Sequence, residues 1–88
     1  MDALEFLSPE TNGIAPLPGV SLIEIYGQNR ILIENHRGII AYEVRQIQIK
    51  VSFGCIVVCG QNLKLRNMSK EKLVITGKIC CINLQGRE

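Results

Sequence analysis

Short apolar runs, separated by glycine and asparagine, dominate the chain from residue 20 onward. The clearest run is residues 46–51, Gln-Ile-Gln-Ile-Lys-Val, in which polar and apolar side chains alternate strictly. Because side chains on a strand point alternately to opposite faces, this pattern places Ile47, Ile49 and Val51 in a core and the polar residues in water. A helix would scatter the same side chains around its circumference, so the pattern predicts an all-β domain.

Eight short strands are expected, and β-branched residues are frequent in them. Residues 56–58, Ile-Val-Val, are apolar on both faces, which indicates a central strand or a strand covered by a partner. The predicted fold class is therefore all-β, a small antiparallel sheet domain, and a sandwich, an open barrel and a short stacked meander all remain open. The expected strands are residues 20–26, 30–34, 38–42, 46–53, 55–59, 63–66, 73–76 and 78–84.

The first 19 residues differ in composition from the rest of the chain. Dipeptides that interrupt helices and strands, such as Ser8-Pro9 and Asn12-Gly13, follow one another closely there. We therefore divide the chain into an extended N-terminal arm (residues 1–19), the all-β domain (residues 20–85) and a C-terminal tail (residues 86–88). The first residues lack the basic and long apolar stretches of a signal peptide, so we expect a cytoplasmic protein. With 88 residues in all, one small core of marginal stability is expected, which favours a partner or self-association.

A faint internal repeat links two parts of the predicted sheet. Gly27-Gln28-Asn29 recurs as Gly60-Gln61-Asn62, and isoleucine and leucine residues recur at matching positions around it. Both a duplication and chance would produce such a match. In either case, each copy is expected to form a turn between two strands.

No motif for catalysis or for metal or cofactor binding occurs in the chain. The four cysteines, at positions 55, 59, 80 and 81, lack the Cys-x-x-Cys spacing of zinc and redox sites, so we expect reduced thiols packed as small apolar groups. The one histidine, His36, lies in an expected turn, where local hydrogen bonds are a simpler role than general-base catalysis. We therefore expect a protein that is not an enzyme and has no catalytic residues, metal or cofactor.

Charge is distributed unevenly, although the net charge is only +2. Residues 1–43 carry six acids and two bases, whereas residues 44–88 carry eight bases and two acids. The small net charge and the 5% aromatic content argue against a nucleic-acid partner. One basic sheet face is expected to serve either as an ordinary solvated surface or as an interaction surface for an anionic membrane, an acidic partner or another copy. Its candidate residues are Lys50, Lys64, Arg66, Lys70 and Lys72.

Several segments of the domain follow one another in a familiar order. They are Pro18-x-Val20-x-Leu22-Ile23, Ile33-Glu34-Asn35-His36-Arg37-Gly38-Ile39-Ile40, Gly54-Cys55-Ile56-Val57-Val58-x-Gly60-x-Asn62-Leu63 and Leu73-Val74-Ile75-Thr76-Gly77-Lys78-Ile79. In this order and spacing the chain resembles the YabP/YqfC family of sporulation proteins, and the YqfC branch in particular. The resemblance covers about residues 16–84. Its most specific part is the family signature turn, Glu34, Asn35, His36, Arg37 and Gly38.

The resemblance implies a non-enzymatic protein that is required for endospore formation and acts in the cytoplasm of the mother cell, with peripheral contact at the outer forespore membrane. It also implies a partner, a sporulation membrane protein such as YqfD. Two mechanisms stay open: an adaptor that docks at the developing spore envelope, and a self-assembling structural β subunit. A generic small β-rich binding module unrelated to sporulation is the remaining alternative. The family has no agreed catalytic residues to transfer.

Overall fold

The computed structural model describes residues 19–86, which form six strands in a single sheet. Apart from Gly19, the expected N-terminal arm lies outside the described residues. The strands are β1 (Leu22–Tyr26), β2 (Arg30–Glu34), β3 (Ile39–Glu43), β4 (Gln46–Val51), β5 (Gly54–Arg66) and β6 (Lys72–Gly86). Every neighbouring pair is antiparallel, and the order across the sheet is β1-β2-β6-β5-β4-β3.

The prediction of an all-β antiparallel domain is confirmed, but the predicted number of strands is wrong. The segments expected as strands 55–59 and 63–66 are one strand, β5, and those expected as 73–76 and 78–84 are one strand, β6. The glycines between these segments bend the strands without ending them. The described residues contain no helix long and apolar enough to cross a membrane.

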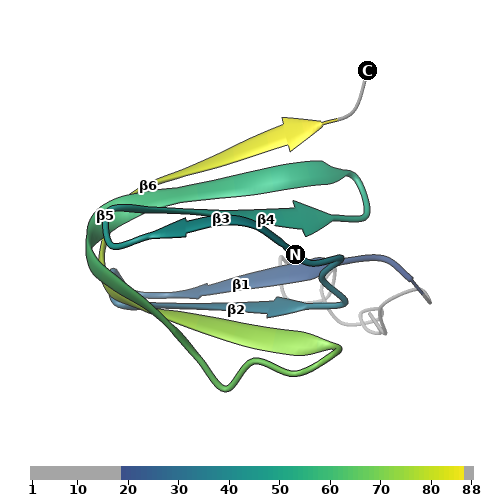
Figure 1. Cartoon of the computed structure of the whole chain (residues 1–88), viewed down its shortest axis with the longest axis horizontal. Helices are drawn as coiled ribbons and strands as arrows, with labels where there is room; N and C mark the ends of the chain where they lie inside the picture. The colour runs from purple at the N-terminus through teal and green to yellow at the C-terminus, as the bar shows by residue number, and fades with distance from the viewer. Residues whose placement is uncertain (1–18, 87–88) are drawn as a thin grey trace, which may run out of the picture.

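The sheet folds over on itself because both long strands bend (Figure 1). We call the two resulting halves the upper and lower layers. Each long strand contributes one half to each layer, so the layers are parts of one continuous sheet. The upper layer contains β3, β4, the start of β5 and the end of β6, and the lower layer contains β1, β2, the end of β5 and the start of β6.

Two glycines on facing strands form the crease between the layers. The pairing of β5 with β6 shifts register twice, at Cys59/Gly60 and between Gln61 and Lys64. A Cβ atom at Gly60 would overlap the backbone carbonyl of Lys78, and one at Gly77 would lie 2.5 Å from the carbonyl oxygen of Asn62. Gly77 also has φ 134°, in the region that favours glycine. The crease therefore depends on the absence of a side chain on both strands.

The core lies between the layers and is almost entirely aliphatic. Ile47, Ile49 and Val51 point into it, which confirms the facing predicted from the alternation in residues 46–51. Val57 is only 7% exposed although it lies on the outer face, because β5 is flanked by β4 and β6. The central-strand interpretation of residues 56–58 is thus confirmed. The other core residues are Ile31, Ile33, Ile56, Val58, Leu63, Leu73, Ile75 and Ile79.

Backbone hydrogen bonds also join the layers beside the crease. On one side, Gly60 N–H donates to the Arg45 carbonyl (3.0 Å) and Leu63 N–H to the Val44 carbonyl (2.9 Å). On the other side, the β1–β2 turn accepts bonds from β6, since Ile79 N–H donates to the Gln28 carbonyl (2.8 Å). The first Gly-Gln-Asn copy is therefore a turn, as predicted. The prediction is wrong for the second copy, which lies within β5.

Replacing Gly77 with alanine should lower the free energy of unfolding by about 3 kcal/mol, because the new methyl group meets a backbone carbonyl at an unfavourable φ. The matched control is Gly86→Ala, where the nearest atom is 3.8 Å away and φ is not positive. That variant should stay within about 0.5 kcal/mol of the parent protein. Urea unfolding followed by circular dichroism measures both, and equal losses would contradict the role of the crease.

Candidate functional site

The family signature turn connects β2 to β3 and ties several distant segments together. Asn35 adopts φ 59°, a left-handed conformation that asparagine tolerates better than most residues. Its backbone N–H donates to the Glu71 carbonyl, and its Nδ2 donates to the Val20 carbonyl (3.0 Å). A guanidinium nitrogen of Arg37 donates to the Gly19 carbonyl (2.6 Å). The turn thus fixes both the entry to β1 and the β5–β6 connection.

Both ring nitrogens of His36 are engaged within this turn. Nδ1 accepts a hydrogen bond from Gly38 N–H (3.2 Å), so the proton of the neutral ring resides on Nε2. Nε2 then donates to the Ser69 carbonyl (2.9 Å). The predicted local hydrogen bond of His36 is confirmed at Nδ1, whereas the bond at Nε2 reaches Ser69, 33 residues away. Neither nitrogen is free to act as a base without breaking a bond.

A reciprocal pair of serines lies beside the turn. Ser21 N–H donates to Ser52 Oγ (3.0 Å), and Ser52 N–H donates to Ser21 Oγ (2.9 Å). The hydroxyl of Ser21 also donates to the Asn35 carbonyl (2.7 Å). Ser21 is the buried polar residue of the described chain, so its bonds satisfy groups that have lost water. The signature turn is accordingly a structural clamp for the end of the molecule away from the crease.

Two substitutions of Asn35 measure separately how its left-handed backbone conformation and its side-chain hydrogen bond to Val20 stabilise the protein. Asn35→Gly retains the left-handed backbone and loses the bond to Val20, which should cost about 1 kcal/mol of unfolding free energy. Asn35→Ala adds backbone strain and should cost about 2 kcal/mol. Thermal or urea unfolding of both variants tests the order. A glycine variant as damaged as the alanine variant would show that the φ angle contributes nothing.

The five cations expected on one face do not lie together. Lys64 and Arg66 project from the outer face of the lower layer, whereas Lys50 lies on the outer face of the upper layer, opposite Cys55. The separation follows from the crease, which turns the two halves of β5 into different layers. Lys70 lies in the β5–β6 connection, and Lys72 forms an ion pair with Glu34 (3.6 Å).

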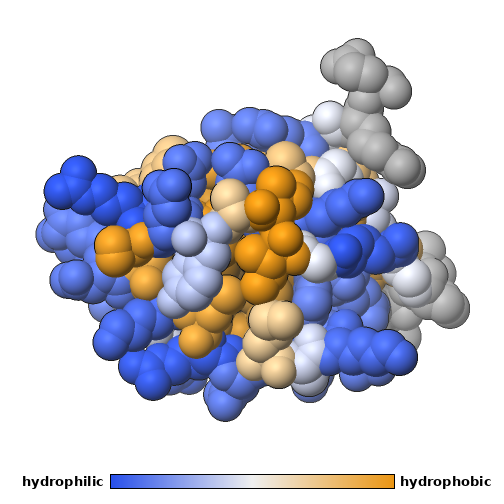
Figure 2. All heavy atoms as spheres, viewed as in Figure 1, coloured by the Kyte–Doolittle hydropathy of each residue, from blue (hydrophilic) through white to orange (hydrophobic). Residues whose placement is uncertain are grey.

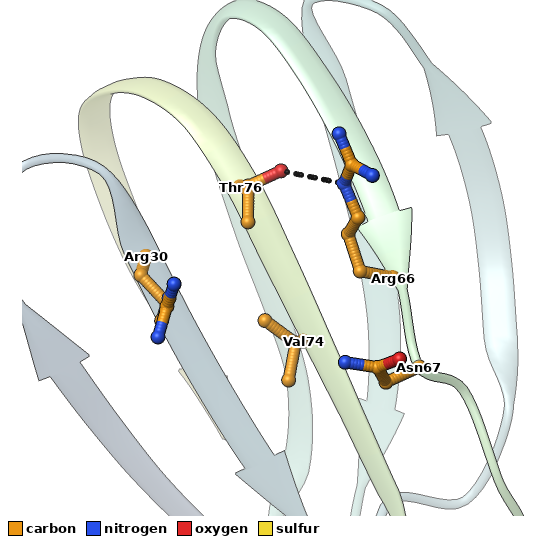
Figure 3. Close-up of a pocket in the computed structure, with 5 residues that line it drawn as sticks. All are labelled: Arg30, Arg66, Asn67, Val74 and Thr76. Atoms are coloured by element: carbon orange, nitrogen blue, oxygen red, sulfur yellow. Dashed lines mark hydrogen bonds between the residues drawn. The ribbon is translucent and has the colours of Figure 1, made fainter.

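The outer face of the lower layer contains a hollow of about 410 Å³ (Figure 3). Its floor is the start of β6, with Val74 and Thr76, and its sides come from the neighbouring strands. Arg30 of β2 pairs with Thr76 in register, and Arg66 of β5 pairs with Val74. Asn67 completes the lining. Sheet pairing therefore places two guanidinium groups on opposite sides of one strand.

Two guanidinium groups give the hollow positive charge. The Nε of Arg66 donates to Thr76 Oγ1 (3.4 Å), which turns this edge of the guanidinium toward β6 (Figure 3). Within residues 19–86, neither Arg30 nor Arg66 forms an ion pair. The carboxylate of nearby Glu24 accepts a bond from the Tyr26 hydroxyl (2.8 Å), and this bond raises the pKa of Tyr26 above its usual value. Positive charge is thus left exposed in the hollow.

A second surface feature is an apolar strip made of Ile40, Tyr42, Val44 and Met68. Each of these side chains is between 52% and 57% exposed. Tyr42 Oη accepts a bond from Leu65 N–H (3.3 Å), and the Val44 carbonyl accepts one from Leu63. Ile40 lies at the register shift between Ile39 and Ala41, and Met68 follows β5 in the β5–β6 connection. Figure 2 shows apolar side chains gathered in the middle of this view, between the layers.

The comparison with known protein families gives a clear result. A model of the YabP family matches residues 19–88. The chain belongs to the YabP family. A relative in this family, the uncharacterized protein YqfC of Bacillus subtilis (strain 168), is 25% identical over 63 residues, which cover 72% of this chain. The chain spans 64% of the length of that relative. No solved structure matches this chain significantly.

Membership of the YabP/YqfC family makes this a sporulation-related protein, as the order and spacing of the sequence segments led us to expect. The described part of this YabP-family chain contains no group of three or more histidine, cysteine or acidic residues able to hold a metal ion. Cys59 and Cys81 face each other across β5 and β6. The expectation of packed thiols is wrong for Cys80 and Cys81, which are exposed because the end of β6 lacks a second neighbour.

Sequence reasoning missed four residues of the hollow, namely Arg30, Asn67, Val74 and Thr76. Alternation places Lys64 and Arg66 on an outer face, but it does not reveal which strand lies beside β5 and β6. Arg30 reaches the hollow only through the pairing of β2 with β6, which joins Arg30 to Thr76 although they are 46 residues apart in the sequence. The apolar strip was missed for the same reason, because its members come from β3, from the β3–β4 turn and from the β5–β6 connection.

Proposed function

We propose that this protein is a non-enzymatic adaptor that acts in the mother cell and docks at the developing spore envelope. Membership of the YabP/YqfC family supports a role in sporulation. Its docking surface is the apolar strip, and its partner is a sporulation membrane protein of the YqfD type. The protein is then held at the cytoplasmic side of the outer forespore membrane by this partner and by peripheral contact.

The observation that carries the proposal is the exposure of the apolar strip. Four large apolar side chains, on β3, in the turn after it and in the β5–β6 connection, remain about half exposed, although single exposed apolar residues are normal on a protein surface. Burial of such a strip against a partner would gain about 25 cal/mol for each Å² of apolar surface removed from water. The engagement of both ring nitrogens of His36 supports a function that involves no catalysis.

A second candidate function, a self-assembling structural subunit, is favoured by the sheet edges. β1 and β3 each have a strand neighbour on one side only. Such edges can pair with a further copy of the chain. The acidic first half and basic second half of the sequence would add attraction between copies.

Replacing both Ile40 and Val44 with threonine tests the adaptor. Threonine retains β-branching, so unfolding free energy should change by less than about 1 kcal/mol at these exposed positions. A fluorescent fusion of the parent protein should form a ring around the forespore, and the double variant should be diffuse in the mother cell. The matched control, Ile25→Thr, changes an isoleucine that is 55% exposed outside the strip and should keep the ring. A ring formed by the double variant would contradict docking through the strip.

Size-exclusion chromatography at low and high salt separates the two candidate functions. An adaptor should elute as the same monomer or dimer at both salt concentrations. Large species at low salt that dissociate at high salt would instead favour self-assembly, since salt screens attraction between exposed charges. The Ile25→Thr variant, on edge strand β1, should reduce such assembly only in the second case.

A further inference from the structure

We propose that the hollow formed by Arg30, Arg66, Asn67 and Thr76 binds a phosphate group. This site lies on the outer face of the lower layer, and its existence does not depend on docking through the apolar strip. The same chemistry is offered by a free phosphorylated molecule and by the headgroup of an anionic phospholipid.

The placement of the two arginines favours a phosphate over a single carboxylate. Arg30 and Arg66 project from β2 and β5, on the two sides of β6. A carboxylate offers two coplanar oxygens, which one guanidinium can engage completely. A tetrahedral phosphate directs its oxygens in several directions, so it can accept bonds from both guanidinium groups at once.

The smaller polar groups of the hollow complement the arginines. Thr76 Oγ1 already accepts a bond from Arg66 Nε, which leaves its hydroxyl proton able to donate to a bound oxygen. Asn67 directly follows β5, and its amide adds two further donors to the lining. The hollow can therefore supply charge and neutral donors to the same group.

Size and surroundings fit a ligand larger than an isolated phosphate. A volume of about 410 Å³ lies within the range of small-ligand sites. Val74 offers an apolar floor for the uncharged part of the ligand. Lys64 pairs in register with Thr76 and adds a third cation to this face. Of the acids on β1 and β2, Glu34 pairs with Lys72 and Glu24 accepts a hydrogen bond from Tyr26.

The test is a titration of the isotope-labelled full chain with inorganic phosphate at constant ionic strength, followed by amide resonances. Resonances of Asn67, Val74 and Thr76 should shift in a saturable manner. The double variant Arg30→Gln/Arg66→Gln should bind about a hundredfold more weakly, or about tenfold for each arginine. The matched control, Arg45→Gln/Lys50→Gln, also removes two positive charges but lies outside the hollow, and its affinity should fall by less than about twofold.

Vesicle sedimentation distinguishes the two sources of phosphate. Binding of the parent protein to phosphatidylglycerol vesicles and not to phosphatidylcholine vesicles, with loss in the Arg30→Gln/Arg66→Gln variant alone, supports a lipid headgroup. Saturable binding of inorganic phosphate without vesicle binding supports a free phosphorylated ligand. The proposal is overturned if neither probe binds, if both double variants lose binding equally, or if a polyglutamate peptide displaces phosphate by occupying the hollow more tightly. None of these results depends on the localisation of the Ile40/Val44 variant, so this proposal and the adaptor can fail separately.

Discussion

The close approach of backbone to backbone at the crease is the constraint on which the rest of the molecule depends. Where β5 and β6 bend, Gly60 lies against the carbonyl of Lys78 and Gly77 against that of Asn62. This contact allows one sheet to supply both layers of its own core. Ile56 and Leu63 lie on the two sides of the bend in β5 and are both buried between the layers. In a flat sheet no second layer would cover this face, and their apolar side chains would remain in water.

The signature turn holds the opposite end of the same structure. The crease fixes the layers where the long strands bend, while hydrogen bonds from Asn35, His36 and Arg37 join the connections at the other end. The hydrogen bonds of the turn therefore stabilise the fold at this end. The two surfaces on which the proposals depend, the hollow and the apolar strip, lie outside the turn.

Much of the fold could be predicted from local pattern, because alternation directly reports which side chains are buried. Residues 46–51 are the best case, since each apolar position there faces the core. The crease could not be predicted in this way. Gly-Gln-Asn occurs once in a turn and once within β5, and only the pairing of β5 with a bent β6 decides between the two outcomes. Lys50 was grouped wrongly with Lys64 for the same reason, and Arg30 could not be assigned to the hollow before the β2–β6 pairing was known.

The pairing of β2 with β6 also sets the order in which the strand pairs of the sheet can form during synthesis. All other strand pairs join neighbours in the sequence, and each can close as a hairpin soon after it leaves the ribosome. The β1–β2 hairpin has no second neighbour until residues 72–76 have emerged, and a hairpin alone is at best marginally stable in water. Ile31 and Ile33 therefore stay exposed until residues 72–76 pair with β2, and the lower layer is completed after the β3–β4 and β4–β5 hairpins can form.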